Sequence, residues 1–402
     1  MFPNLRILRW EFIRETFPLM HHLAVSSLTS LDINFVFGDV PPFHTFPESL
    51  GDLCPGMRNF RVRMRRPQVD SDETISSLVS RWTSLQVLYC PYITLNVDAI
   101  FHLSCTPSLT NLSFALNTEI ADRIASSRST LLFSGLRDLE ISSQTLASIS
   151  TLLPHTRLPS IESFTVYIDC CPSKYTLKSC LTALQKVCTP QSLVSLKLIQ
   201  TRSPSAINLG SERYQLSLED IQPCMSFGYL RRLDINTAWT VNLTDNDVLY
   251  LASAWPHLEY LMINEEWGWR TEGGVTPGGL LRLLERLQSL RHFCLAMDTR
   301  DYAGIAPALA STRTAGFTPR VPFTVNVADS DIQPESVEAL AAFFGGIMQQ
   351  HINVSSYYWC TTTMADRLDS DISKRLWEDV FVKAHERFSV QSQSLPTDLE
   401  KA

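Results

Sequence analysis

The segment LTDNDVLYLASAWPHLEYLMI, residues 243–263, combines the two patterns that decide the fold of this chain. Its first half has apolar residues at the i, i+3, i+4, i+7 spacing of one helical face: Val248, Leu251, Ala252 and Trp255. Apolar residues then follow in the order expected of a turn and a short strand: Leu258, Leu261 and Ile263. The segment therefore predicts a helix that leads directly into a strand.

Two aspartates, Asp245 and Asp247, stand two residues apart behind Thr244. A metal site or an acid–base pair can have this spacing, but so can a helix start. Thr244 fits the N-cap, Asp247 fits the reciprocal third position of a capping box, and both carboxylates suit the positive end of the helix dipole. We therefore interpret both aspartates as helix-capping residues.

The strand pattern, in which apolar residues are separated by two residues and then by one, recurs along the chain. Its first positions are between 23 residues (Leu5 to Leu28) and 37 residues (Leu193 to Leu230) apart. The eleven occurrences begin at Leu5, Leu28, Met57, Leu85, Leu109, Leu136, Ile161, Leu193, Leu230, Leu258 and Leu290. Such a repeat predicts an α/β leucine-rich-repeat solenoid, a horseshoe of the ribonuclease-inhibitor type with a parallel inner sheet and outer helices.

Helical patterns between these strands predict the outer layer. The clearest are DETISSLVSRW (residues 72–82), SKYTLKSCLTALQKVC (173–188), and GGLLRLLERLQ behind the cap and first-turn proline Thr276-Pro277. We predict a single leucine-rich-repeat domain over residues 1–388 with about 11 to 12 irregular repeats. Residues 335–388 form its C-terminal capping part, after a last strand at Val325 and Val327. The polar residues 389–402 are predicted to be a disordered tail.

Composition indicates an ordinary globular protein, with 45% hydrophobic and 19% charged residues. The net charge of -7 gives no general attraction to nucleic acid or to an anionic membrane, so we expect neither as a partner. No basic leader and no run of about 18 apolar residues occurs. Ten cysteines without a CxxC pair favour a reducing compartment, so we expect a cytoplasmic or nuclear protein.

A search for catalytic motifs finds none: the sequence lacks GxSxG, HExxH, a phosphate-binding GK[ST] loop and a zinc-spaced Cys/His set. Isolated histidines such as His102 and His292 lack partner motifs, and we interpret them as structural. We therefore predict no enzymatic activity, no cofactor and no metal. Enzymatic activity without a recognisable motif is a third hypothesis, which we rank after the two non-catalytic hypotheses given below.

Strand alternation assigns a set of mostly polar side chains to the concave face of the sheet, because neighbours of inward-pointing residues point outward. These partner-binding candidates are Arg61, Arg63, Tyr89, Asp138, Glu140, Tyr167, Lys197, Asp234 and Tyr260, and we include with them Trp267 and Trp269 from the loop after the tenth strand. A face of this length is large enough for a protein interface of about 800 Å² per partner. Its mixture of charges suits a protein or peptide partner, and it is also what an idle soluble surface looks like.

Two local features have alternative interpretations. MRNFRVRMRRP, residues 57–67, concentrates arginines, either for phosphate or an acidic partner or as a solvated strand face. NEEWGWRTEGG, residues 264–274, carries Trp267 and Trp269 after the tenth strand. The two rings are either exposed binding anchors or part of the edge of the core.

The segment of residues 243–298, with its helix, AWPxLExL strand, Trp-Gly-Trp loop and GLL helix, resembles the leucine-rich repeats of fungal F-box proteins, especially those of basidiomycetes. Weaker similarity covers FPNLRILRW, VNVADSDI and LWEDVFVKAHERF. The resemblance implies the substrate-binding repeat region of a ubiquitin-ligase receptor. It covers the repeats only, because the chain begins inside the first repeat at FPNLRILRW, without the helical F-box module that docks on the ligase adaptor. An adaptor is therefore an expected partner only if an F-box lies upstream.

Two functional hypotheses follow. The first is a non-catalytic recognition module whose concave face binds a protein or peptide, as the substrate-binding part of an F-box receptor. The second is a free-standing leucine-rich-repeat scaffold or inhibitor without a link to ubiquitin.

Overall fold

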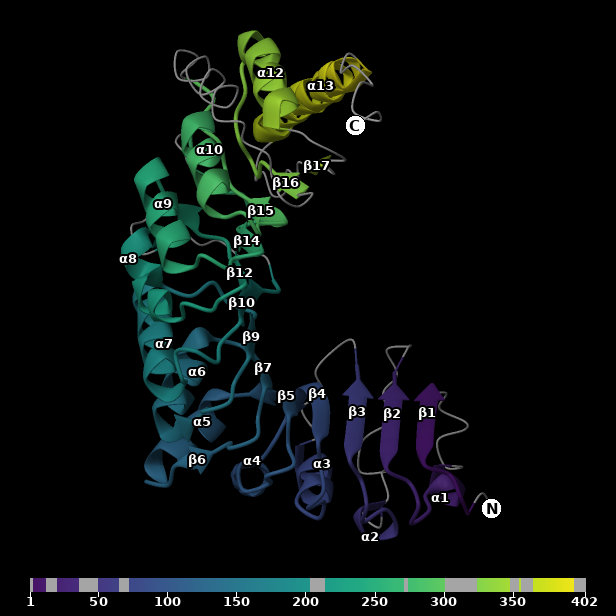
Figure 1. Ribbon diagram of the computed structural model, residues 1–402. Coiled ribbons are helices and arrows are strands. Elements are labelled where there is room, and N and C mark those ends of the chain that lie inside the picture. Colours follow the sequence, from purple (N-terminus) through teal and green to yellow (C-terminus); the bar gives the residue numbers. More distant parts are fainter. Residues whose placement is uncertain are drawn as a thin grey trace, which may run out of the picture. The chain divides into compact units, whose positions relative to one another are not determined.

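The computed structural model describes residues 3–11, 20–35, 50–64, 72–202, 214–270, 274–300, 324–347, 354–355 and 364–393. The chain divides into two compact units, Met1–Arg202 and Ser203–Ala402. Each unit contains parallel strands with helices on one side of them (Figure 1). The prediction of a single domain over residues 1–388 is not tested by this division and stays a prediction.

The first unit has a parallel sheet in which sequential repeats are neighbours, in the order β1-β2-β3-β4-β5-β7-β9-β10. Every neighbouring pair is parallel, which requires a crossover on the way to each next strand. The strands are β1 (Ile7–Glu11), β2 (Ser30–Asn34), β3 (Asn59–Arg63), β4 (Val87–Thr94), β5 (Asn111–Leu116), β7 (Asp138–Ser143), β9 (Ser163–Ile168) and β10 (Ser195–Gln200).

Helices form the second layer of this unit. They are α1 (Met20–Leu23), α2 (Leu50–Leu53), α3 (Asp72–Val79), α4 (Val97–Ser104), α5 (Thr118–Ser126), α6 (Leu146–Leu152), the 3-10 turn η4 (Leu153–His155) and α7 (Lys174–Val187). Short parallel strands β6 (Leu131–Leu132) and β8 (Thr156–Arg157) pair beside them. Asn96, Asn117 and Ser173 cap α4, α5 and α7 by accepting a backbone N–H bond, which satisfies one free donor of each helix start.

The core of the first unit lies between strands and helices. In β2 the alternation is strict, with Leu31 and Ile33 fully buried between partly exposed neighbours. Trp82, just after α3, is also fully buried and its ring lies 5.0 Å from that of Phe60, centroid to centroid. Each such side chain contributes roughly 1.5–3 kcal/mol when it leaves water. The helix-to-strand packing predicted from DETISSLVSRW is therefore confirmed.

The second unit repeats this plan with the strands β12 (Arg232–Asn236), β14 (Tyr260–Ile263), β15 (His292–Cys294), β16 (Thr324–Asn326) and β17 (Val354–Ser355), all parallel. A short parallel pair joins β11 (Gln215–Leu216) and β13 (Thr240–Val241). Its helical elements are α8 (Leu218–Ile221), η6 (Gln222–Ser226), α9 (Asp245–Ala254), α10 (Pro277–Arg286), η7 (Pro334–Ser336), α12 (Val337–Ile347) and α13 (Met364–Gln393).

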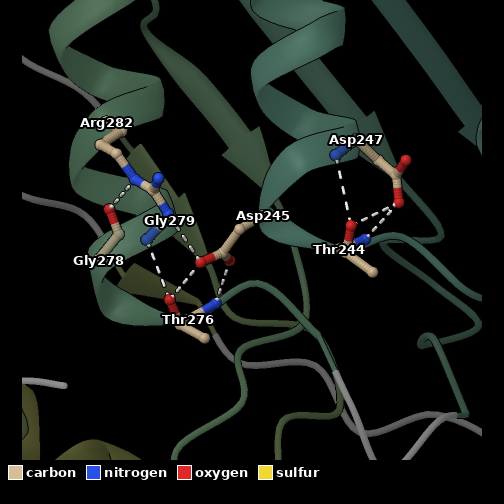
Figure 2. A network of polar contacts seen from close by, with 7 residues as sticks. All are labelled: Thr244, Asp245, Asp247, Thr276, Gly278, Gly279 and Arg282. Atoms are coloured by element: carbon tan, nitrogen blue, oxygen red, sulfur yellow. Dashed lines mark hydrogen bonds and ion pairs between the residues drawn. The ribbon is translucent and has the colours of Figure 1, made fainter.

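The helix start predicted at Thr244 is confirmed (Figure 2). The Thr244 hydroxyl accepts from the Asp247 N–H, and Asp247 Oδ2 accepts from the Thr244 N–H at 2.8 Å. Asp245 does something different: its carboxylate accepts from the N–H and the hydroxyl of Thr276, the N-cap of α10, at 2.8 and 2.6 Å. The interpretation as helix caps is thus right for Asp247, whereas Asp245 connects two successive helices.

The C-terminal helices α12 and α13 pack on each other, and their role as the capping part of the domain stays a prediction. Trp377 of α13 is fully buried, and Phe344 of α12 meets it with ring centroids 6.1 Å apart. Two details of the prediction are wrong. β16 is not the last strand, because β17 follows and pairs with it. The helix α13 ends at Gln393, so it covers the first residues of the predicted tail, while residues 394–402 lie outside the described residues.

All eleven segments with the recurring apolar pattern lead into strands of these two sheet regions. Parallel strands at this repeat, with the described helices on one side of each sheet region, constitute the leucine-rich-repeat fold. The predicted fold class is therefore confirmed. The face of each sheet region that carries no helices is called the open face below.

Candidate functional site

One row of polar side chains crosses the open face of the first unit. Direct register pairs connect its members from β3 to β10. This charged row consists of Arg61, Tyr89, Ser113, Glu140, Thr165 and Lys197. Neighbouring strands lie about 4.8 Å apart, so the row spans about 24 Å from the guanidinium-bearing strand to the lysine-bearing one. Its charge runs from positive through negative to positive.

A shallow hollow of about 280 Å³ lies along this row and is lined by all six of its residues. Three further polar side chains, Asn111, Asp138 and Ser163, line the same hollow from the row beside it. Asn111 Nδ2 donates to Asp138 Oδ2 at 2.5 Å, across paired strands. The sheet therefore offers a continuous strip of donors, acceptors and charges rather than an apolar surface.

Glu140 is the acidic centre of the row. Ser113, on the neighbouring strand, donates its hydroxyl to Glu140 Oε1 at 2.8 Å. Burial raises the pKa of Glu140, and the Ser113 hydrogen bond and the positive charge of Lys197 oppose that rise. Burial, followed by the negative charge of Glu162, also raises the pKa of Asp138. Two carboxylates that lack full solvation favour a cationic group placed above them.

The two ends of the row are cationic. Within the described residues, neither Arg61 nor Lys197 has a carboxylate within ion-pair distance. Arg63, by contrast, pairs with Asp32 through its Nη2 at 3.2 Å. Arg61 and Lys197 are thus the groups that remain available to an anionic partner. Arg65 and Arg66 of the predicted arginine cluster lie outside the described residues.

Tyr89 stands between Arg61 and Ser113 in the row and is partly exposed. Burial raises the pKa of its phenol, and the charge of Glu140 raises it further. The phenol therefore stays protonated at neutral pH and can donate a hydrogen bond. Tyr167 is partly exposed two residues beyond Thr165 on β9, opposite Ser142 on β7.

The open face of the second unit carries a stack of three side chains. The Arg232 guanidinium carbon lies 4.9 Å from the centroid of the Tyr260 ring. The His292 ring stacks on Tyr260 with centroids 4.7 Å apart and planes 9° from parallel. Burial, and then the charges of Arg232 and Arg291, lower the pKa of His292. Asp234, the other predicted residue of this face, pairs with Arg232 Nη2 at 3.3 Å.

The tryptophans of the loop after β14 are not exposed anchors, so their inclusion as partner-binding residues is wrong. Trp269 is fully buried and Trp267 is 8% exposed. The Trp269 indole N–H donates to the Ile263 carbonyl at 2.9 Å, while its backbone N–H donates to Asp329 Oδ1 at 2.6 Å. The rings belong to the edge of the core, which is the second of the two interpretations given above.

Asn264 likewise does not face the open side, although strand alternation assigns it there. The strand ends at Ile263, and Asn264 has a positive φ of 54°. Its buried side chain accepts from the Thr237 N–H at 3.0 Å and donates to the Trp239 carbonyl at 2.8 Å. Because the backbone conformation changes at this residue, the Asn264 side chain points into the loop between two repeats and away from the open face.

Sequence reasoning missed Asn111 and Ser113 as members of the site. Both lie at open-face positions of β5 by the same alternation that identifies Glu140 on β7. Neither is charged or aromatic, and Ser113 is buried beneath longer neighbours. The register between strands, rather than the type of residue, is the signal that identifies them.

Metal binding and membrane insertion were also considered for the described part of the chain. There, no three His, Cys, Asp or Glu side chains converge in a way that could hold a metal ion. His102, interpreted as structural, contacts the Trp82 carbonyl through Nε2 at 3.2 Å. Among the same residues, no helix combines the length and the apolar character needed to cross a membrane.

Comparisons with known proteins give no family assignment: no protein-family model and no curated protein matches the chain. Among solved structures, the chain is similar to the leucine-rich-repeat-containing protein LegL7 of Legionella pneumophila, at 13% identity and a TM-score of 0.37, over 93% of this chain and 97% of that one. It is also similar to an internalin of Listeria monocytogenes, at 14% identity and a TM-score of 0.35, over 84% and 82% of the two chains. The fold assignment rests on the strands and helices of the chain itself.

Proposed function

We propose that this protein is a recognition module whose first unit binds an extended segment of a partner protein across the strands of its open face. The observation that carries the proposal is the charged row, in which Arg61 and Lys197 flank the carboxylate of Glu140 and have no ion-pair partner among the described residues. Charges arranged in this way select a partner by complementarity and steer its approach.

The spacing of the row defines the segment that fits it. Arg61 and Glu140 are three strands apart, or about 14 Å, which an extended peptide covers in about four residues. Glu140 and Lys197 are two strands apart, or about 10 Å, which corresponds to about three residues. The complementary segment therefore has a basic residue between two acidic ones, with the pattern Glu-x-x-x-Lys-x-x-Glu or its reverse.

Peptides of both chain directions, labelled with a fluorophore, test the proposal by fluorescence anisotropy with the full chain. We expect one of them to bind and its charge-inverted counterpart, Lys-x-x-x-Glu-x-x-Lys, to bind at least about tenfold more weakly. Arg61→Glu should weaken binding of the matching peptide. The same variant should bind a second peptide in which a lysine replaces the glutamate that lies opposite position 61. The control is Arg123→Glu, which makes the same charge change on the exposed surface of α5.

Arg63→Glu is a second test variant. Because Arg63 is paired with Asp32, its replacement should weaken peptide binding less than Arg61→Glu does. The double variant Arg61→Glu/Arg63→Glu should lose binding while its melting temperature stays near that of the parent protein. Equal binding of the matched and charge-inverted peptides, or a large fall in melting temperature, would contradict the assignment of this face.

We further propose, on the resemblance of residues 243–298 to fungal F-box proteins, that the recognition serves a ubiquitin-ligase receptor, in which the repeats select the substrate. The supporting observation is the similarity of the helix, strand, Trp-Gly-Trp and GLL segments. The test is adaptor binding by the protein expressed with whatever coding sequence precedes Met1. Capture of the adaptor supports the receptor role. Failure to bind it, together with peptide recognition, would instead favour a scaffold or inhibitor without a link to ubiquitin.

A further inference from the structure

A second surface of the first unit, on the helical side, carries a different charge arrangement. A groove of about 490 Å³ lies beside α7, between this helix and the segment that runs from α6 through β8. Its lining includes Arg157, Tyr175, Lys178, Thr182 and Lys186, and no carboxylate lines it. This surface is called the α7 groove below.

Helical geometry gathers the groove residues on one side of α7. At 100° per residue, the polar and aromatic positions of α7 that line the groove fall within an arc of about 100° on the helix. These positions are Tyr175, Lys178, Ser179, Thr182 and Lys186. The opposite side of the helix buries Leu177, Leu181 and Leu184 in the core. The lysines are therefore held on a firmly packed helix.

In the part of the chain that the structure describes, the cations of the groove have no acidic partner. Among the described residues, no carboxylate lies within ion-pair distance of Arg157, Lys178 or Lys186. The guanidinium of Arg157 donates to the Thr156 carbonyl at 2.8 Å, a neutral acceptor that leaves its charge uncompensated.

The sequence around the groove explains why no compensation occurs. Between Glu140 and Glu212 the acidic residues are Glu162 and Asp169. Glu162 pairs with Arg137 at 3.2 Å and Asp169 pairs with Arg202 at 3.3 Å. Both nearby carboxylates are thus engaged elsewhere, and the groove keeps a local positive potential within a protein of net charge -7.

The groove also has an apolar component. Ala183 and Val187 are buried in its wall, Pro154 is exposed at its edge, and the Tyr175 side chain is 69% exposed. Lysine side chains add their methylene stems to such a surface while the ammonium groups stay in water. A ligand that fits combines negative charge with at least one apolar side chain.

We propose that the α7 groove binds an acidic peptide segment of a protein partner, through Arg157, Lys178 and Lys186, with an apolar side chain of the segment against Tyr175. Lys178 and Lys186 are eight residues apart on α7, which is about 12 Å along the helix axis. Carboxylates about three or four residues apart in an extended segment match that distance. The site is separate from the charged row of the open face and does not depend on the function proposed for it.

Binding of a labelled Glu-x-Leu-x-Glu-Glu peptide to the full chain, followed by fluorescence anisotropy at low and physiological salt, tests the proposal. Lys178→Glu and Lys186→Glu should each reduce affinity by about tenfold, because each replaces an attraction by a repulsion. Arg123→Glu on α5 is the matched control and should change affinity less than twofold. Arg61→Glu should also leave this binding unchanged, which separates the α7 groove from the open face.

Thermal melting of each variant checks that the fold is retained, and these exposed side chains should change the melting temperature little. The proposal is overturned if Lys186→Glu binds the peptide as well as the parent protein does. It is also overturned if single-stranded DNA or vesicles containing an anionic lipid bind more tightly than the peptide and lose binding in the same two variants. In that case the groove recognises a nucleic acid or a membrane surface.

Discussion

The carboxylate of Asp245 accepts two hydrogen bonds from Thr276, which stands 31 residues later at the N-cap of the next helix. Arg282, six residues further along the chain in that helix, pairs with the same carboxylate at 3.2 Å (Figure 2). Thr276 in turn accepts from the Gly279 N–H at 3.1 Å. One side chain at the start of α9 therefore fixes the start of α10.

Replacement of this residue should destabilise the second unit more than replacement of its neighbour. We expect Asp245→Ala to lower the free energy of unfolding by about 2 kcal/mol, since it removes the acceptor of the Thr276 N–H, the Thr276 hydroxyl and the Arg282 guanidinium. Asp247→Ala removes a local capping box and should cost about 1 kcal/mol. Urea denaturation of the two variants measures the difference. Equal losses would show that the contact between helices adds nothing to a simple cap.

Gly279 gives a sharper test of the same contact. A Cβ at this position would lie 2.0 Å from Asp245 Oδ1, so Gly279→Ala must displace the carboxylate. We expect the substitution to be destabilising in the parent protein. In the Asp245→Ala background the obstruction is gone, and the better helix propensity of alanine should make it neutral or stabilising by up to about 1 kcal/mol. A double-mutant cycle measures this change of sign, and additive effects would contradict it.

The loop after β14 depends on Gly268 and Asp329. Gly268 has a φ of 71°, and a Cβ there would lie 2.5 Å from the Asp329 carboxylate, which accepts from the N–H groups of Trp269 and Arg270. Gly268→Ala should therefore cost about 2 kcal/mol or more, from backbone strain and the displaced acceptor.

Intrinsic tryptophan fluorescence during urea unfolding is a suitable measurement, since Trp269 is fully buried beside this contact. Asp329→Ala should give a loss of similar size, because it leaves the two N–H groups without their acceptor. The Gly268→Ala/Asp329→Ala double variant should lose less than the sum of the single variants. If Gly268→Ala is as stable as the parent protein, the positive φ carries no constraint.

Glu140 should make stability depend on pH in a defined direction. Its pKa in the folded protein is raised above the ordinary value of 4.5, chiefly by burial. The favourable contribution of the neutral carboxyl is fully present below pH 4.5 and is lost as the pH rises through the raised pKa. Glu140→Gln, which keeps an acceptor for Ser113, should therefore stabilise the protein at pH 7 and lose this advantage toward pH 4.

Urea midpoints measured between pH 4 and pH 7 test this expectation. Glu119→Gln, on the exposed first turn of α5, provides the comparison. It should be neutral or slightly destabilising at pH 7, because a carboxylate near a helix N-terminus is favourable. A Glu140→Gln variant that is less stable than the parent at pH 7 would indicate that the attraction of Lys197 outweighs the cost of burial.

Cysteine reactivity should separate exposed from buried thiols. Burial raises the pKa of Cys180 and of Cys188 to about 12, so almost no thiolate forms at pH 8. Cys105 and Cys170 are exposed. Iodoacetamide at pH 8 should modify these two within the native protein and leave the buried pair unmodified until denaturant is added. Peptide mass spectrometry identifies the modified positions, and early labelling of Cys180 would contradict its burial in α7.

The sequence by itself determined the repeating unit. The apolar spacing around Trp255 and Leu258 specifies a helix and a strand with one apolar side each, and such units can bury those sides only by stacking. Period-two alternation also identified Arg61, Glu140 and Lys197 as open-face residues, because successive side chains of a strand point to opposite faces.

Tertiary structure alone decided which side chains meet. The register between β5 and β7 brings Ser113 to Glu140, and the turn geometry after Ile263 buries Asn264 and Trp269. The tertiary structure also places the Asp245 carboxylate against Thr276 of the next helix, where it accepts from the Thr276 N–H, and not against the N-terminus of its own helix. These contacts join residues from different repeats, whose spacing varies along the chain. A local pattern carries no information about them, because they depend on how far each crossover displaces one repeat from the next.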